Sequence, residues 1–128
     1  MLAVDTNIII RYLIGDHPQQ SAKVRKLFDE NDIFVCTTVL LEAEWVLRSV
    51  YGFKLVQIVE AFSGIAGLPR VTLQEPAVAN ALDWVRQGAD FADAIHFLTS
   101  RGCDAFLTFD TQFAKTMKRS GEMQIRTL

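Results

Sequence analysis

Residues 1–13 read MLAVDTNIIIRYL, a short apolar run that is followed by Asp-Thr and then by a longer apolar stretch. Near the other end of the chain, residues 105–114 read AFLTFDTQFA and repeat the apolar run followed by Asp-Thr. A short apolar run that ends in Asp is typical of a buried strand passing into a helix, because Asp favours the N-cap position. The two stretches therefore predict strand-to-helix turns, with Asp5 and Asp110 at the ends of their strands.

Short apolar runs alternate with helical periodicity along the rest of the chain. Strands are expected at residues 2–4, 33–36, 71–73 and 105–109, with a weaker one at 124–126. Among the helices between them, Pro18 suits a first turn, Thr38 can cap the helix that carries Glu42, and Asp90 can cap a helix that ends near Arg101. Further helices are expected at 55–65, after Pro76 and after Asp110. This alternation indicates an α/β fold with a mainly parallel sheet of about four to five short strands, covered by helices on both faces.

The composition bounds the class of protein. The chain has 128 residues, of which half are hydrophobic, and we expect a single domain over residues 1–128. No apolar stretch approaches the ~20 residues that a membrane span needs, so we expect no membrane partner and a soluble, cytoplasmic protein. Cys36 and Cys103 form no C-x-x-C pattern and are expected to be buried free thiols, which makes zinc improbable. The net charge of −2 taken alone argues against a nucleic-acid partner.

Five acidic side chains stand in apolar stretches, namely those of Asp5, Glu42, Asp90, Asp93 and Asp110. An uncompensated buried charge costs several kcal/mol, so such carboxylates are paired, protonated or bound to a metal. Parallel strands end at one edge of their sheet, which would bring Asp5 and Asp110 together. A divalent cation is the expected compensation, and its charge would also permit a polyanionic partner. The alternative is that both Asp residues simply cap the helices that follow them.

Glu42 belongs to a helix whose residues 39–47 are apolar almost all round, and such a helix is usually buried. Glu44 is its competitor, because side chains two positions apart on a helix point about 200° away from each other. At most one of the two acids can face a given site. A solvated helix edge is the alternative for either.

Asp90, Asp93, His96 and Ser100 recur at helical spacing and give one polar edge to their helix. Asp93 lies in the first turn, where the helix dipole favours an anion, so it suits a metal ligand as well as a cap. His96 could contact phosphate, or it could be a hydrogen-bonded histidine of the core or of an interface. Oxygen ligands suit magnesium better than imidazole does.

Three stretches together resemble the PIN domain nuclease family, especially VapC-type toxins of bacterial toxin–antitoxin pairs. They are VDTNIIIRYL at 4–13, TTVLLEAEWVLRSVYG at 37–52 and GADFADAIHFLTSRGCDAFLTFDTQFA at 88–114. The resemblance implies a three-layer α/β/α fold and an endoribonuclease that depends on Mg²⁺, with Mn²⁺ as a substitute. Its catalytic and metal-binding acids would be Asp5, Glu42, Asp93 and Asp110. Glu42 is preferred over Glu44 because the acid of the family typically precedes an aromatic-Val-Leu element by three positions, as Glu42 precedes Trp45.

The resemblance also implies partners. These are a structured RNA such as tRNA or rRNA as substrate, a cognate antitoxin that covers the site, and a second copy of the chain in a homodimer. Side chains that could support the site or contact substrate are those of Thr6, Asn7, Asp90, His96 and Lys115. Lys115, Lys118 and Arg119 share one helix face and could contact phosphates, as could Arg11 and Arg48; a solvated basic face is the alternative.

Two other classes of function compete with the nuclease. An Asp-dependent phosphatase would want a second acid two positions after Asp5, where this chain has Asn7, and a receiver domain would want a lysine near its last strand that cannot be placed. A non-catalytic RNA-binding or protein-binding module would be expected to have a broken acid set. The acid set of this chain is intact.

Overall fold

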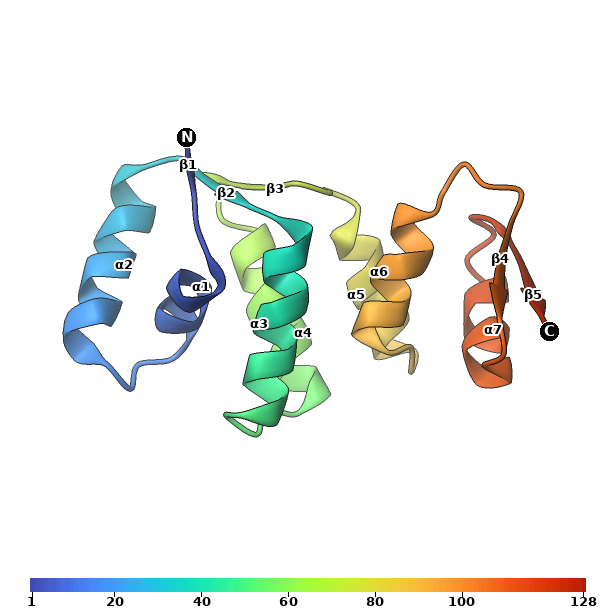
Figure 1. Ribbon diagram of the computed structural model, residues 1–128. Coiled ribbons are helices and arrows are strands. Elements are labelled where there is room, and N and C mark those ends of the chain that lie inside the picture. The colour runs from blue at the N-terminus through green and yellow to red at the C-terminus, as the bar shows by residue number, and fades with distance from the viewer. The chain divides into compact units, whose positions relative to one another are not determined.

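The computed structural model describes all 128 residues, which form two compact units, Met1–Pro76 and Ala77–Leu128. The first unit contains three strands and four helices, whose course can be followed in Figure 1. In chain order they are β1 (Leu2–Ala3), α1 (Thr6–Leu13), α2 (Pro18–Glu30), β2 (Ile33–Val35), α3 (Thr37–Ser49), α4 (Leu55–Ala66) and β3 (Val71–Leu73).

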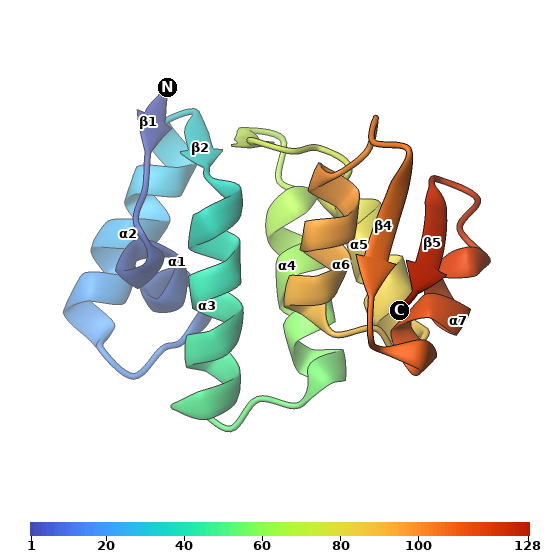
Figure 2. The same ribbon diagram turned by 45° about the vertical axis from the view of Figure 1, so that its right-hand side comes forward.

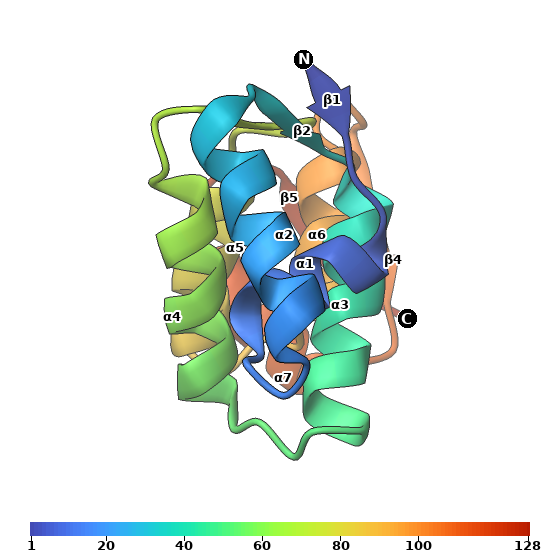
Figure 3. The same cartoon turned by 90° about the vertical axis from the view of Figure 1, so that its left-hand side faces the viewer.

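The sheet of the first unit is parallel, with strand order β1-β2-β3. Ile33 of β2 is in register with Leu2 of β1 on one side and with Val71 of β3 on the other. Helix α1 packs against both α2 and α3 (Figure 3). Helix α4 packs against α3 and β3. The core of this unit is apolar, and its fully buried side chains include those of Ile9, Ile33, Leu40, Leu47, Ile58 and Phe62.

The second unit contains α5 (Val78–Arg86), α6 (Phe91–Thr99), β4 (Ala105–Thr108), α7 (Thr111–Lys118) and β5 (Gln124–Thr127). Strands β4 and β5 are parallel and lie side by side (Figure 2), with Ala105 in register with Gln124. Helix α5 packs against α6, and α7 packs against β5. Phe97 of α6 is fully buried at the centre of an aromatic cluster. Its ring lies 5.6 Å from that of Trp84, 5.5 Å from Phe106 and 6.3 Å from Phe113, all in edge-on geometry.

Local side-chain chemistry sets where several helices begin. Asp5, Asp90 and Asp110 cap α1, α6 and α7, as the sequence predicted, and Pro18 is the first residue of α2. The predicted cap at Thr38 is wrong, because α3 already begins at Thr37 and its N-cap residue is Cys36, whose side chain accepts no cap hydrogen bond. The N–H of Thr37 donates instead to Oε1 of Gln74 at 3.0 Å.

The α/β class and the five predicted strands are confirmed, with ends that shift by one residue at most. The strands form a three-stranded and a two-stranded sheet, however, where the sequence predicted one sheet. Apolar runs fix where strands lie along the chain, but pairing depends on packing between distant segments. Both cysteines are free, as predicted, but Cys103 is exposed and Cys36 only half-buried. None of the helices is both long and apolar enough to cross a lipid bilayer.

Candidate active site

Asp5 stands at the carboxyl end of β1, where the chain turns into α1. Its Oδ1 accepts a hydrogen bond from the backbone N–H of Ile8 at 3.1 Å, which fixes the carboxylate at the start of the helix. The side chain is exposed and Oδ2 makes no hydrogen bond within the first unit, so this oxygen can bind a cation. Thr6 beside it is buried, and Asn7 is exposed.

Asp110 holds the same position in the second unit, between β4 and α7. Its Oδ1 accepts a hydrogen bond from the backbone N–H of Phe113 at 2.9 Å, and its own N–H donates to Oγ1 of Thr108 at 3.0 Å. One hydrogen bond therefore holds the carboxylate and the other holds the backbone of Asp110, while the side chain stays exposed. Asp5 and Asp110 are equivalent products of the repeated apolar-Asp-Thr pattern, each at the carboxyl end of a strand of its own sheet.

The fold shifts the pKa of the Asp93 carboxyl in the second unit. Burial raises the pKa of its carboxyl above the ordinary value of 3.8, the charges of Asp90 and Asp110 raise that pKa further, and His96 lowers it. The charge of Asp110, at the start of α7, is the smallest of these effects on the pKa of Asp93. Asp90 is tied to the same turn, since its Oδ1 accepts from the N–H of Asp93 at 3.1 Å.

The raised pKa of Asp93 has a defined effect on stability. Between pH 3.8 and the higher pKa of the folded state, the folded protein holds this proton more tightly than the unfolded chain does. The contribution of Asp93 to stability therefore falls as pH rises through that window, and the ionised carboxylate is unfavourable at neutral pH. A cation bound to Asp93 would remove this cost.

Glu42 and Glu44 lie on opposite sides of α3, as the helical geometry requires. Glu42 is exposed, whereas Glu44 is only 6% exposed and accepts a hydrogen bond from Nε of Arg48 at 2.9 Å. The predicted apolar surroundings are wrong for Glu42, since Trp45 of the same helix is 55% exposed. They are also wrong for Asp5, Asp90 and Asp110, which are all exposed. Helix α3 presents one side to the core, and Glu44, not Glu42, is the acid on that side.

The basic candidates differ in how they are held. His96, Lys115, Lys118 and Arg119 are exposed, so His96 is not a core histidine. Arg11 is fixed, because its guanidinium donates to Gln20 at 2.7 Å, to Asp16 at 3.2 Å and to the Tyr51 hydroxyl at 3.5 Å.

A groove of about 510 Å³ lies beside Asp5 in the first unit. Its lining residues come from α1 with its N-cap residue and from α2, and they are Asp5, Asn7, Ile8, Arg11, Gln20, Lys23 and Val24. Sequence reasoning missed Lys23. The available signal was its place three residues after Gln20 on α2, which puts both side chains on the same helix face.

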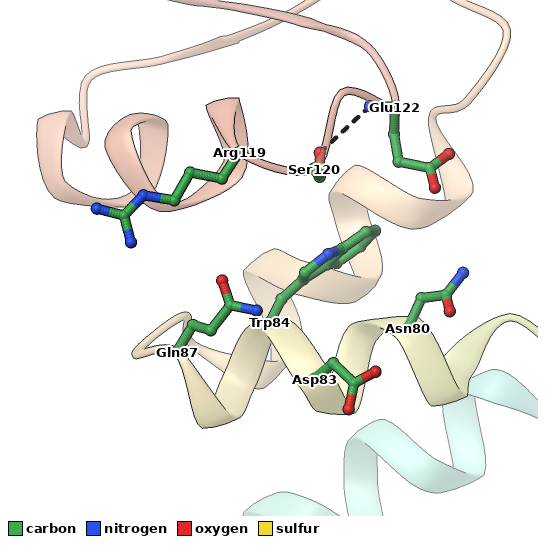
Figure 4. Close-up of a pocket in the computed structure, with 7 residues that line it drawn as sticks. All are labelled: Asn80, Asp83, Trp84, Gln87, Arg119, Ser120 and Glu122. Carbon is green, nitrogen blue, oxygen red and sulfur yellow. Dashed lines mark hydrogen bonds between the residues drawn. The ribbon is translucent and has the colours of Figure 1, made fainter.

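A second pocket lies in the second unit and contains none of the predicted acids. About 280 Å³ in volume, it is lined by Asn80, Asp83, Trp84, Gln87, Arg119, Ser120 and Glu122 (Figure 4). Trp84 is only 7% exposed there, and Asp83 is paired with Arg86 at 2.6 Å. The indole of this pocket is therefore largely covered and its Asp83 is already paired.

The predicted metal ligands are divided between the two units, with Asp5 and Glu42 in the first and Asp93 and Asp110 in the second. Within each unit, no three His, Cys, Asp or Glu side chains are arranged as a set of metal ligands. The chemistry of the four acids fits a hard divalent cation, because carboxylate oxygens suit Mg²⁺ and Mn²⁺. The like-charge repulsion at Asp93 fits a cation as well. Their convergence on one ion stays a prediction.

The comparisons with known proteins identify the family. A family model described as PIN domain matches residues 2–118, which is nearly the whole chain. The chain therefore belongs to the PIN domain family, whose members are generally nucleases and typically use divalent metal ions. No curated protein and no solved structure matches it.

Proposed function

We propose that this protein is a Mg²⁺-dependent endoribonuclease, the VapC-type toxin of a toxin–antitoxin module, and that it cleaves a structured RNA such as tRNA or rRNA. The observation that carries the proposal is the match of the PIN domain family over residues 2–118, together with an Asp93 carboxyl whose pKa is raised by burial and by nearby carboxylates. The exposed Asp5 and Glu42 complete the acid set. We also propose that residues 1–128 act as a single nuclease domain.

Asp5, Glu42, Asp93 and Asp110 would hold the cation. A divalent cation bound by these carboxylates would lower the pKa of a water molecule, making it a nucleophile, and would neutralise charge on the phosphodiester. Mn²⁺ can serve in place of Mg²⁺, because both accept oxygen ligands.

Other contacts of the chain would orient the carboxylates and provide positive charge for the phosphates of the substrate. The N-cap hydrogen bonds of Asp5 and Asp110 hold one oxygen of each carboxylate and leave the other for the cation. Asp90 orders the first turn of α6 and thereby orients Asp93. The exposed side chains of His96 and Lys115 are available for the phosphates of the substrate, while Thr6 and Asn7 support the turn at Asp5.

The proposal also covers the binding partners of the protein and its cellular location. The family often binds RNA and antitoxin proteins. We propose a cognate antitoxin that covers the acids, a homodimer, no membrane partner and a cytoplasmic location. Phosphatase chemistry is disfavoured because Asn7 stands where a second acid would be needed.

The test is RNA cleavage by purified protein that is free of antitoxin. Total tRNA and rRNA are incubated with Mg²⁺, with Mn²⁺ or with EDTA, and the fragments are resolved on a sequencing gel. We expect discrete fragments with either metal, none with EDTA, and none with Asp5→Asn. Asp29→Asn is the matched control, since Asp29 is an exposed Asp of the same unit outside the acid set. Cleavage that survives both EDTA and Asp5→Asn would contradict the proposal. RNA binding without cleavage would favour the non-catalytic module.

Glu42 and Glu44 are predicted to separate function from stability. Glu42→Gln should reduce cleavage and leave the free energy of unfolding within about 0.5 kcal/mol of wild type, because Glu42 is exposed. Glu44→Gln should lower the free energy of unfolding by about 1–3 kcal/mol, because a buried carboxylate loses its charged hydrogen bond to Arg48. Urea denaturation and the cleavage rate per folded molecule are the measurements. If Glu44→Gln alone abolishes cleavage, the assignment of Glu42 is wrong.

A further inference from the structure

We propose that the groove between α1 and α2 binds the sugar-phosphate backbone of single-stranded RNA next to Asp5, with Lys23 and Arg11 as its phosphate contacts. The inference deepens the proposed function, on which it rests, by assigning the path of the substrate strand. It also assigns a role to Lys23, which the acid set leaves unused.

The lining of the groove suits a polyanion. Lys23 brings an unpaired positive charge, Arg11 brings a second one that is paired with Asp16 at 3.2 Å, and Asp5 brings one negative charge. The amides of Asn7 and Gln20 add hydrogen-bond donors and acceptors. A cation held by Asp5 would make the groove more positive still. Amide and basic side chains are the groups that contact phosphate and sugar oxygens in protein–nucleic acid complexes.

Arg11 is preorganised for such a contact. Gln20 from α2 holds its Nε, while Asp16 and Tyr51 hold Nη1, and the Tyr51 hydroxyl also donates to Asp16 at 3.3 Å. The side chain of Arg11 keeps 26% exposure, so the guanidinium is fixed in place and still reachable from the groove. A charge that is already immobilised loses less conformational entropy when a phosphate binds.

Lys23 is the unpaired positive charge of the groove. It is exposed and forms no ion pair or hydrogen bond within the first unit. Lys26, one turn further along α2, is also exposed but lies 3.9 Å from Glu30 and does not line the groove. The same helix therefore carries a groove lysine and a matched lysine outside it.

The test compares Lys23→Ala with Lys26→Ala in the full chain. Binding of a fluorescein-labelled 12-nucleotide single-stranded RNA is followed by anisotropy in EDTA over a range of salt concentrations. Lys23→Ala should weaken binding about 3- to 10-fold near 0.1 M salt and lower the slope of log K against log salt by about 0.7, the value for one phosphate contact to a single strand. Lys26→Ala should change neither quantity beyond about 1.5-fold. With Mg²⁺, Lys23→Ala should raise KM and leave kcat within about twofold, because Lys23 positions the strand and does not hold the cation.

Equal effects of the two lysine variants would overturn the groove assignment. A short poly-glutamate peptide is the competing ligand: if its binding depends on Lys23 and that of RNA does not, the groove is a protein-docking site and the inference is wrong. Different outcomes would contradict the groove assignment and the proposed nuclease function. Lys23-dependent RNA binding without Mg²⁺-dependent cleavage would overturn the nuclease, whereas Asp5-dependent cleavage with no difference between Lys23→Ala and Lys26→Ala would overturn only the groove.

Discussion

Replacing Asp110 with asparagine is expected to reduce RNA cleavage by about 100-fold or more and to leave the fold intact. Asn caps a helix about as well as Asp does, so the hydrogen bond to the N–H of Phe113 is kept while the charge that would hold the cation is lost. Asp110→Ala should lose the cap as well, and its free energy of unfolding should fall by about 1 kcal/mol. Cleavage rates and urea denaturation measure the two effects.

Asp104→Asn is the control for Asp110, because it makes the same carboxylate-to-amide change at an exposed position of the same unit. It should leave both cleavage and stability near wild type. If Asp110→Asn cleaves as fast as wild type while Asp110→Ala is destabilised, Asp110 is a helix cap only. Asp110 would then have to be removed from the proposed set of metal ligands.

Replacing Phe97 with alanine is expected to lower the free energy of unfolding by about 3–5 kcal/mol. The Phe97 side chain is 0% exposed and contacts the rings of Trp84, Phe106 and Phe113, so its removal leaves a cavity where α5, α6, β4 and α7 meet. Because α6 carries Asp93 and Asp110 lies between β4 and α7, cleavage should fall as well.

Phe97→Leu is the graded control, since leucine leaves a smaller cavity at the same position. Urea denaturation should show a clearly smaller decrease in the free energy of unfolding for Phe97→Leu than for Phe97→Ala. If Phe97→Ala lowers the free energy of unfolding by less than about 1 kcal/mol, Phe97 does not pack at the centre of the aromatic cluster. Circular dichroism at the temperature of the cleavage assay separates unfolding from displacement of the acids in a folded protein.

The helix starts at Asp5, Asp90 and Asp110 could be predicted because each depends on a hydrogen bond that spans three residues. A contact of this kind is encoded within one short stretch of sequence. Strand positions followed from equally local apolar runs. The pairing of the strands and the burial of the acids were predicted less well, because both depend on which distant segments pack together.

The α/β class and the turns that carry Asp5 and Asp110 could be inferred from local sequence, as could the resemblance to the PIN domain family, which the match over residues 2–118 confirms. Three features required the folded structure: the burial of Glu44 beside Arg48, the effect of nearby charges on the pKa of Asp93, and the position of Lys23 in a groove next to Asp5. The two groups differ in the sequence separation of the residues that interact. Helix caps and apolar periodicity depend on residues a few positions apart, whereas burial and electrostatic effects arise from packing between helices and strands that are distant in the chain.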